Sequence, residues 1–163
     1  MIQRNFRLIS IAVLLVSTVS CLAAEPLPSS IVTGNVQTFA ISCPDNPQQT
    51  TIDMNNCIST KLDAVKSVEK KYVSVARSRI SAEKNNQALG AFEKENQAWD
   101  RLIEASSQAT YAYWREGTLR GLKATDREIA LIELRIHDQW QNWLGYEDST
   151  PPLLPEPRFN NVE

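Results

Sequence analysis

The sequence predicts an all-α fold, in which a long antiparallel helical hairpin packs against a third helix. From residue 50 onward, apolar side chains recur every three or four positions in three successive segments, which is the pattern of amphipathic helices. The polar run SAEKNN (81–86) and the glycine-bracketed run EGTLRGLKA (116–124) separate these segments. Connections this short place consecutive helices antiparallel to one another.

The first helix is predicted to begin at Thr50 or Thr51, either of which can cap it, with Asp53 in the first turn. The run SAEKNN then holds a turn. It contains neither Pro nor Gly, so a continuous long helix is the alternative. The apolar stripe of this helix consists of Met54, Ile58, Leu62, Val65, Val68, Tyr72 and Val75.

The second and third helices are predicted from similar stripes. A capping box of Thr125 and Glu128 starts the third helix and Gly145 ends it. The second stripe consists of Leu89, Phe92, Trp99, Leu102, Ile103, Ser106, Tyr113 and Trp114, and the third of Ile129, Ile132, Ile136, Trp140 and Trp143.

The segments that flank this helical domain, residues 50–145, are rich in turn-forming residues. Residues 25–49 are expected to form an irregular arm, with at most a short extended piece at VQTFAI (36–41). Residues 146–163 are expected to form a Pro-rich tail without a helix.

Residues 1–24 have the pattern of a secretory signal peptide, which predicts a periplasmic protein. Arg4 and Arg7 precede an apolar run at 8–17 that is too short to span a bilayer, and small residues follow, with cleavage after Ala23 or Ala24. Two alternatives stay open: a retained membrane anchor, and a lipoprotein with its lipid on Cys21. Thr18 stands where lipoprotein signals usually carry Leu.

The charge balance makes nucleic acid an unsuitable partner. Without residues 1–24 the chain keeps 15 basic and 19 acidic residues, a net charge of −4. This mild acidity suits a cationic protein partner better. Apart from the possible lipid, nothing in the mature sequence indicates a membrane partner.

Cys43 and Cys57 are expected to form a disulfide. An exported protein meets an oxidising compartment, and Cys21 is either removed with the leader or consumed by a lipid. Closing this loop corresponds to roughly 3 kcal/mol of chain-entropy stabilisation. The bridge would tie the arm to the start of the first helix. Two free buried cysteines are the alternative; a metal site would need more ligands than two thiols and one histidine.

Residue types that carry catalysis are sparse. His137, next to Asp138, is the only histidine, and the sequence has neither a glycine-rich phosphate loop nor a metal-ligand cluster. Acidic pairs such as Glu93 and Glu95 are typical of a solvated helical face. These observations indicate a protein that acts by binding, without enzymatic activity, cofactor or metal.

Two places are candidates for partner contacts. The run from Glu116 to Lys123, which includes Arg120, is expected to be an exposed loop, and such loops often carry binding, although a plain connector is the alternative. Leu131 and Leu134 lie off the main stripe of the third helix. They belong either to a binding surface or to a helix that packs between two neighbours.

Three stretches resemble the lysozyme-inhibitor LprI-type domain of bacterial envelope proteins. In TTIDMNNCISTKLDAVKSVEKKYVSVA (50–76) the residues that match the family pattern are Thr51, Met54, Asn55, Cys57, Asp63 and Tyr72, with Asp53 where the family tends to have Glu. ENQAWDRLIEASS (95–107) is similar to the second helix through Gln97, Ala98 and Trp99. ALIELRIHDQW (130–140), around Arg135, is similar to the third helix, and Cys43 resembles the upstream half of the first disulfide.

The sequence departs from this family at its second disulfide. Ser107 stands where the family has one cysteine, and no cysteine follows Cys57. The resemblance implies an inhibitor that blocks a peptidoglycan-active enzyme, either lysozyme or a wall-targeting toxin injected by a rival bacterium, for which it would be the immunity protein. The alternative is an envelope adaptor that inhibits no enzyme.

Overall fold

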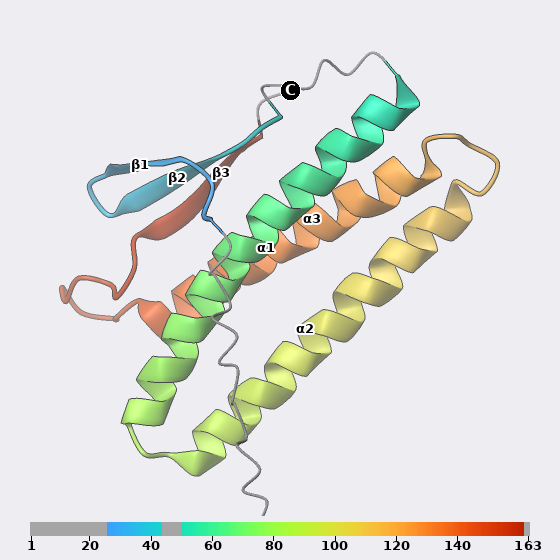
Figure 1. Ribbon diagram of the computed structural model, residues 1–163. Coiled ribbons are helices and arrows are strands. Elements are labelled where there is room, and N and C mark those ends of the chain that lie inside the picture. The colour runs from blue at the N-terminus through green and yellow to red at the C-terminus, as the bar shows by residue number, and fades with distance from the viewer. Residues whose placement is uncertain (1–25, 44–49, 162–163) are drawn as a thin grey trace, which may run out of the picture.

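The computed structural model of the protein describes residues 26–43 and 50–161, and it shows three long helices beside a three-stranded sheet (Figure 1). The fold is therefore mixed α/β, and the expected all-α class is wrong. The predicted signal peptide and Cys21 lie outside the described residues, so both stay predictions.

The three helices form the predicted hairpin with a third helix across it. They are α1 (Thr51–Ala82), α2 (Asn86–Tyr113) and α3 (Arg120–Gln139), and α3 continues into a π-helical turn, η1 (Trp140–Leu144). In Figure 1, α1 and α2 join at the bottom of the view and diverge upward, while α3 packs against both of them. Because α1 and α2 diverge, α3 holds them together over most of their length.

The ends of the helices test the predicted caps. Thr50 and Asp53 form a capping box at the start of α1, as expected, and the turn after α1 passes through Lys84, whose φ is +55°. The predicted start of α3 is wrong: the helix begins at Arg120, after Leu119, without a side-chain cap. Thr125 and Glu128 are thus interior helical residues.

The sheet joins the two segments that flank the helical domain. It consists of β1 (Ser30–Thr33), β2 (Val36–Ile41) and β3 (Glu156–Asn161), in the order β1-β2-β3. β2 pairs antiparallel with β1 and parallel with β3. The extended piece at 36–41 is confirmed as β2, whereas the otherwise irregular arm is wrong because it also contains β1. The described part of the Pro-rich tail has no helix, as expected, but it contributes β3, which the sequence did not predict.

The hairpin between β1 and β2 follows from local sequence. Thr33 pairs with Val36 across the two-residue loop Gly34–Asn35, and the φ of Gly34 is +59°. A tight hairpin turn with a positive φ at its first central position favours glycine there. The pairing of β3 has no such local cause, because its partner lies more than 100 residues earlier in the chain.

The sheet packs on the helices through aromatic side chains. Phe39 is fully buried, stacks on Phe159 of β3 at 5.8 Å between ring centroids, and meets the ring of Tyr72 edge-on at 6.4 Å. The Tyr72 hydroxyl donates a 2.8 Å hydrogen bond to the Pro155 carbonyl, and Trp140 Nε1 donates one of 2.9 Å to Leu154. The tail is therefore fixed to both α1 and η1.

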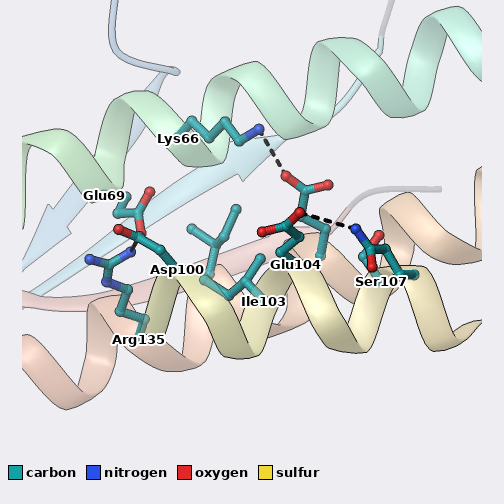
Figure 2. Close-up of a pocket in the computed structure, with 10 residues that line it drawn as sticks. Lys66, Glu69, Asp100, Ile103, Glu104, Ser107 and Arg135 are labelled. Atoms are coloured by element: carbon teal, nitrogen blue, oxygen red, sulfur yellow. Dashed lines mark hydrogen bonds and ion pairs between the residues drawn. The ribbon is translucent and has the colours of Figure 1, made fainter. Parts of the chain in front are cut away.

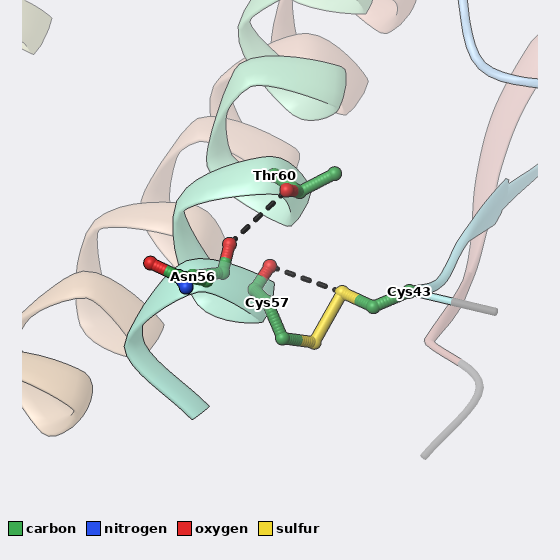
Figure 3. Close-up of a disulfide and its surroundings, with 4 residues drawn as sticks. All are labelled: Cys43, Asn56, Cys57 and Thr60. Atoms are coloured by element: carbon green, nitrogen blue, oxygen red, sulfur yellow. Dashed lines mark hydrogen bonds between the residues drawn. A yellow bond between two sulfur atoms is a disulfide. The ribbon is translucent and has the colours of Figure 1, made fainter. Parts of the chain in front are cut away.

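The predicted disulfide is confirmed and joins the sheet to α1 (Figure 3). Cys43 lies two residues beyond β2, Cys57 lies near the start of α1, and their Cα atoms are 5.5 Å apart. Cys57 is buried. The bridge thus anchors the end of β2 on the helix against which the sheet packs.

Candidate functional site

The end of the molecule where α1 begins and α2 passes into α3 exposes an unusual number of large apolar side chains. Tyr113 is 85% exposed and Ile52 is 71% exposed. A shallow hollow of about 510 Å³ lies between Thr51 and the connecting loop, so the start of α1 adjoins that loop. We define the tip surface as Ile52, Tyr111, Tyr113, Trp114, Arg115, Glu116, Leu119 and Arg120.

The loop at the tip is ordered by its own hydrogen bonds. The Gly117 amide donates to the Trp114 carbonyl at 2.9 Å, and Arg120 Nη1 donates to the Arg115 carbonyl at 3.2 Å. The guanidinium of Arg120 also lies over the ring of Tyr111, 4.8 Å from its centroid. An exposed loop that is ordered in this way loses less conformational entropy when it binds a partner.

The connecting loop of the tip surface carries two basic side chains, Arg115 and Arg120, and one acidic side chain, Glu116. Asp53, next to Ile52 at the start of α1, adds a second acidic side chain at this end of the molecule. Arg115 Nε lies 3.9 Å from Glu116 Oε1, but both side chains are at least 80% exposed. Water screens such a pair, so the two groups remain available to a partner.

The predicted contact residues fall in different places. Glu116 and Arg120 are exposed on the tip surface, while Lys123 is half-buried in the first turns of α3. Leu131 is part of the core and Leu134 is 56% exposed. The burial of Leu131 agrees with the interpretation that α3 packs between two neighbours.

Sequence reasoning missed the aromatic part of this surface. Tyr113 and Trp114 were expected to end the buried stripe of the second helix, but Trp114 is 42% exposed and Tyr113 more so. Polar residues at Ser106 and Thr110 interrupt that stripe after Ile103, and this interruption was the available signal. At the end of α2 these two rings contact each other edge-on, 6.1 Å between their centroids, and both stay largely exposed.

A second hollow, a cleft of about 300 Å³, lies among the three helices (Figure 2). α1 lines it with Lys66 and Glu69, and α2 lines it with Asp100 and residues 103–108. In Figure 2, Arg135 of α3 lies at one end of the cleft and Ser107 of α2 at the other. Between α1 and α3, Lys66 Nζ pairs with Glu128 Oε1 at 2.8 Å.

Arg135 connects all three helices. Its side chain is 7% exposed, and its Nη1 lies 2.7 Å from Glu69 Oε1 of α1 and 2.8 Å from Asp100 Oδ1 of α2. Its Nη2 donates to Asn96 Oδ1 at 2.7 Å. A guanidinium presents several donors in a fixed planar geometry, so one side chain can satisfy partners on two neighbouring helices.

Burial raises the pKa of Glu69 above its ordinary value, and this outweighs the opposing effect of the Arg135 charge. Glu95, which directly precedes Asn96 on α2, also has a raised pKa. The cause is mainly burial, with a smaller contribution from the negative charge of the nearby Asp138. The interior of the bundle therefore disfavours additional negative charge, and its polar groups hold the helices in place.

His137 does not take part in a catalytic arrangement within residues 26–43 and 50–161. Its Nε2 lies 3.7 Å from Glu156 Oε1, and its ring is 5.7 Å from that of Trp140. In the same part of the chain, no group of three or more His, Cys, Asp or Glu side chains is placed to hold a metal ion. Nor does any described helix combine the length and hydrophobicity needed to cross a bilayer.

Comparison of the chain with models of known protein families, with curated proteins and with solved structures finds no match.

Proposed function

We propose that this chain is an exported inhibitor or immunity protein that binds and blocks a peptidoglycan-active enzyme through its tip surface. The observation that carries the proposal is the tip itself, a projecting, self-ordered loop with exposed Tyr113, Trp114 and Arg115. Tyrosine, tryptophan and arginine are the residues that most often dominate the free energy of protein–protein binding.

The shape and charge of the tip suit an enzyme that cleaves glycans. Such enzymes usually hold a pair of carboxylates beside the scissile bond in an open cleft. The exposed side chain of Arg115 can pair with a carboxylate in such a cleft, and the exposed ring of Tyr113 can take the place of a sugar ring. Arg120 lies against Tyr111 and orders the loop that presents them. Complementary charge of this kind also accelerates association.

The resemblance to the LprI-type domain supports the same proposal. The three stretches that carry it contribute Glu69, Asn96, Asp100 and Arg135, which meet in one partly buried network between the helices. The disulfide Cys43–Cys57 also fits an oxidising compartment such as the periplasm. These residues hold the scaffold, so the tip is left to contact the target.

The alternative function, an envelope adaptor that inhibits no enzyme, is based on a Pro-rich tail and on Leu131 and Leu134 as a free face, and two of these features are used within the fold. Leu131 lies in the core, and the Pro-rich tail pairs with β2 as β3. Leu134 alone remains exposed on that part of α3.

The direct test is inhibition of wall-degrading enzymes. The purified, oxidised protein is mixed with a panel of muramidases, amidases and peptidases acting on purified peptidoglycan, and their turnover is measured with and without it. We expect stoichiometric inhibition of at least one class, and protection of cells into whose periplasm that enzyme is sent. A panel that shows neither binding nor inhibition would remove the proposal.

A further inference from the structure

The outer edge of β1 has no pairing strand among the described residues. β2 lies between β1 and β3, and no other described strand pairs with β1. All four residues of β1, Ser30–Thr33, are exposed. This holds on both faces of the strand, including the face that is directed toward the helices. Ile31 is 74% exposed and Val32 is 57% exposed.

The two edges of the sheet differ in how well they resist further pairing. β3, at one edge, has the sequence EPRFNN, and its proline and charged side chains are features that discourage another strand from adding there. β1, at the other edge, has the sequence SIVT, and residues 26–43 contain no charged side chain. β-branched residues of this kind favour strand pairing.

The pairing of β1 with β2 fixes which backbone groups face outward. The Ala40 amide donates to the Ser29 carbonyl at 2.9 Å. In an antiparallel pair, alternate residues bond to the same neighbour, so Ile31 bonds toward β2 and the amide and carbonyl groups of Ser30 and Val32 point away from it. These groups form a template for one more strand.

We propose that this edge pairs with β1 of a second copy of the chain, in an antiparallel register centred on Ile31. Ser30 of each copy then exchanges two backbone hydrogen bonds with Val32 of the other, and the two Ile31 side chains form the close, non-hydrogen-bonded pair between them. A two-fold axis perpendicular to the sheet generates this arrangement, as is usual for dimers.

The sequence of β1 is suited to pairing with an identical strand from a second copy of the chain. In this register every outward-facing amide of Ser30 and Val32 meets a carbonyl, Ile31 meets Ile31, and no like charges are opposed because the strand carries none. The helices of both copies stay on one face of a continuous six-stranded sheet. Because all four residues of β1 are exposed within the described part of the chain, the second copy has room to approach.

The first experiment measures self-association of the full chain by sedimentation equilibrium. A contact of four residues per strand buries well under about 1,000 Å², so we expect a reversible dimer at protein concentrations up to about 1 mM. Ile31→Lys opposes two charges at the centre of the contact and should weaken the dimer by roughly tenfold or more. Ile52→Lys, an equally exposed isoleucine at the tip, is the matched control and should leave the dimer unchanged.

The second experiment tests the register. In a Cys21→Ser background, Ile31→Cys should give a disulfide-linked dimer under mild oxidation, because the Cα atoms of a non-hydrogen-bonded pair lie about 4.5 Å apart. Thr33→Cys is the control: the two copies of that position would be separated by roughly 13 Å along the strands, so it should not cross-link.

A monomer at every concentration, or a dimer that survives Ile31→Lys, would overturn the inference. So would a monomeric protein that loses binding to an extended peptide on Ile31→Lys, because the edge would then serve another partner. The inhibitor proposal is tested separately, since inhibition should respond to Ile52→Lys and be insensitive to Ile31→Lys.

Discussion

At the scale of single residues, Arg135 has the greatest structural consequence. Its guanidinium is the buried positive charge that Glu69 and Asp100 share, and it reaches them from a third helix. A buried pair of charges gives little net stability by itself, but removing one partner leaves the other buried without compensation. Arg135 therefore fixes how the three helices are placed relative to one another.

We predict that Arg135→Met lowers the free energy of unfolding by about 3 kcal/mol, because Glu69 loses its counter-charge in the interior. The double variant Arg135→Met with Glu69→Gln should regain part of that loss. Urea unfolding of the wild type, both single variants and the double variant measures the coupling. Arg127→Met, an exposed arginine on the same helix, is the control and should change stability by less than about 0.5 kcal/mol. Equal losses in both arginine variants would contradict this role.

The raised pKa of Glu69 predicts a pH dependence of stability. Because its pKa is higher in the folded protein than in the unfolded chain, protonation of Glu69 favours folding. This contribution is fully present below the unfolded value of about 4.3 and is lost as pH rises through the folded pKa. The unfolding free energy of the wild type minus that of Glu69→Gln should therefore increase as pH falls from 7 toward 4. A difference that stays flat or decreases would show that the Arg135 charge outweighs burial.

At the scale of elements, the sheet depends on a strand from the far end of the chain. β3 pairs in parallel with β2, and Phe159 of β3 stacks on the fully buried Phe39 of β2. The disulfide fixes the other end of β2 to α1. β2 is therefore held by a covalent bridge and by β3, while the four-residue β1 contributes little burial.

We predict that Phe159→Ala destabilises the protein by about 2 kcal/mol, because Phe39 loses its stacking partner and the half-buried ring leaves a gap. Hydrogen exchange should quicken first in β2 and in residues 154–161, ahead of the helices. Asn160→Ala, at the neighbouring exposed position, is the control and should have little effect. Uniformly faster exchange across all elements would mean that the sheet and the helices unfold together.

At the scale of the whole molecule, the loop of the tip surface lies at one end of the helices and the sheet lies along the side of the bundle (Figure 1). The interhelical network and the disulfide stabilise the scaffold, whereas Tyr113, Trp114 and Arg115 make no comparable contribution to the core. Such separation lets the tip be changed without unfolding the protein.

We predict that Tyr113→Ser combined with Trp114→Ser weakens binding to the target enzyme by roughly 100-fold, since two exposed aromatic anchors are removed. The midpoint of urea unfolding should barely change. Tyr146→Ser, at an aromatic residue of similar exposure to Trp114 near the other end of α3, is the control for loss of exposed aromatic surface. Inhibition that survives the double change would place the contact surface elsewhere.

The helices could be predicted from the sequence because their signals are local. The cap of Thr50 with Asp53, the turn before Asn85 and the buried stripe from Ile58 to Tyr72 each depend on residues a few positions apart. The pair Cys43–Cys57 followed from the number of cysteines and the expected oxidising compartment. The exposure of Glu116 and Arg120 could be predicted because connections between helices lie at the surface.

Other features were decided only when distant segments met. β3 is a short strand in a Pro-rich tail, and it becomes a strand because the exposed edge of β2 and the ring of Phe39 offer it backbone partners and burial. In the same way, the exposure of Trp114 depends on the divergence of α1 from α2, and the burial of Leu131 depends on what α3 meets on both sides. The sequence by itself determined that three helices form, where α1 begins and which cysteines could pair. The tertiary structure decided which side chains remain exposed, because hydrogen-bond partners and buried area are supplied by segments far away in the chain.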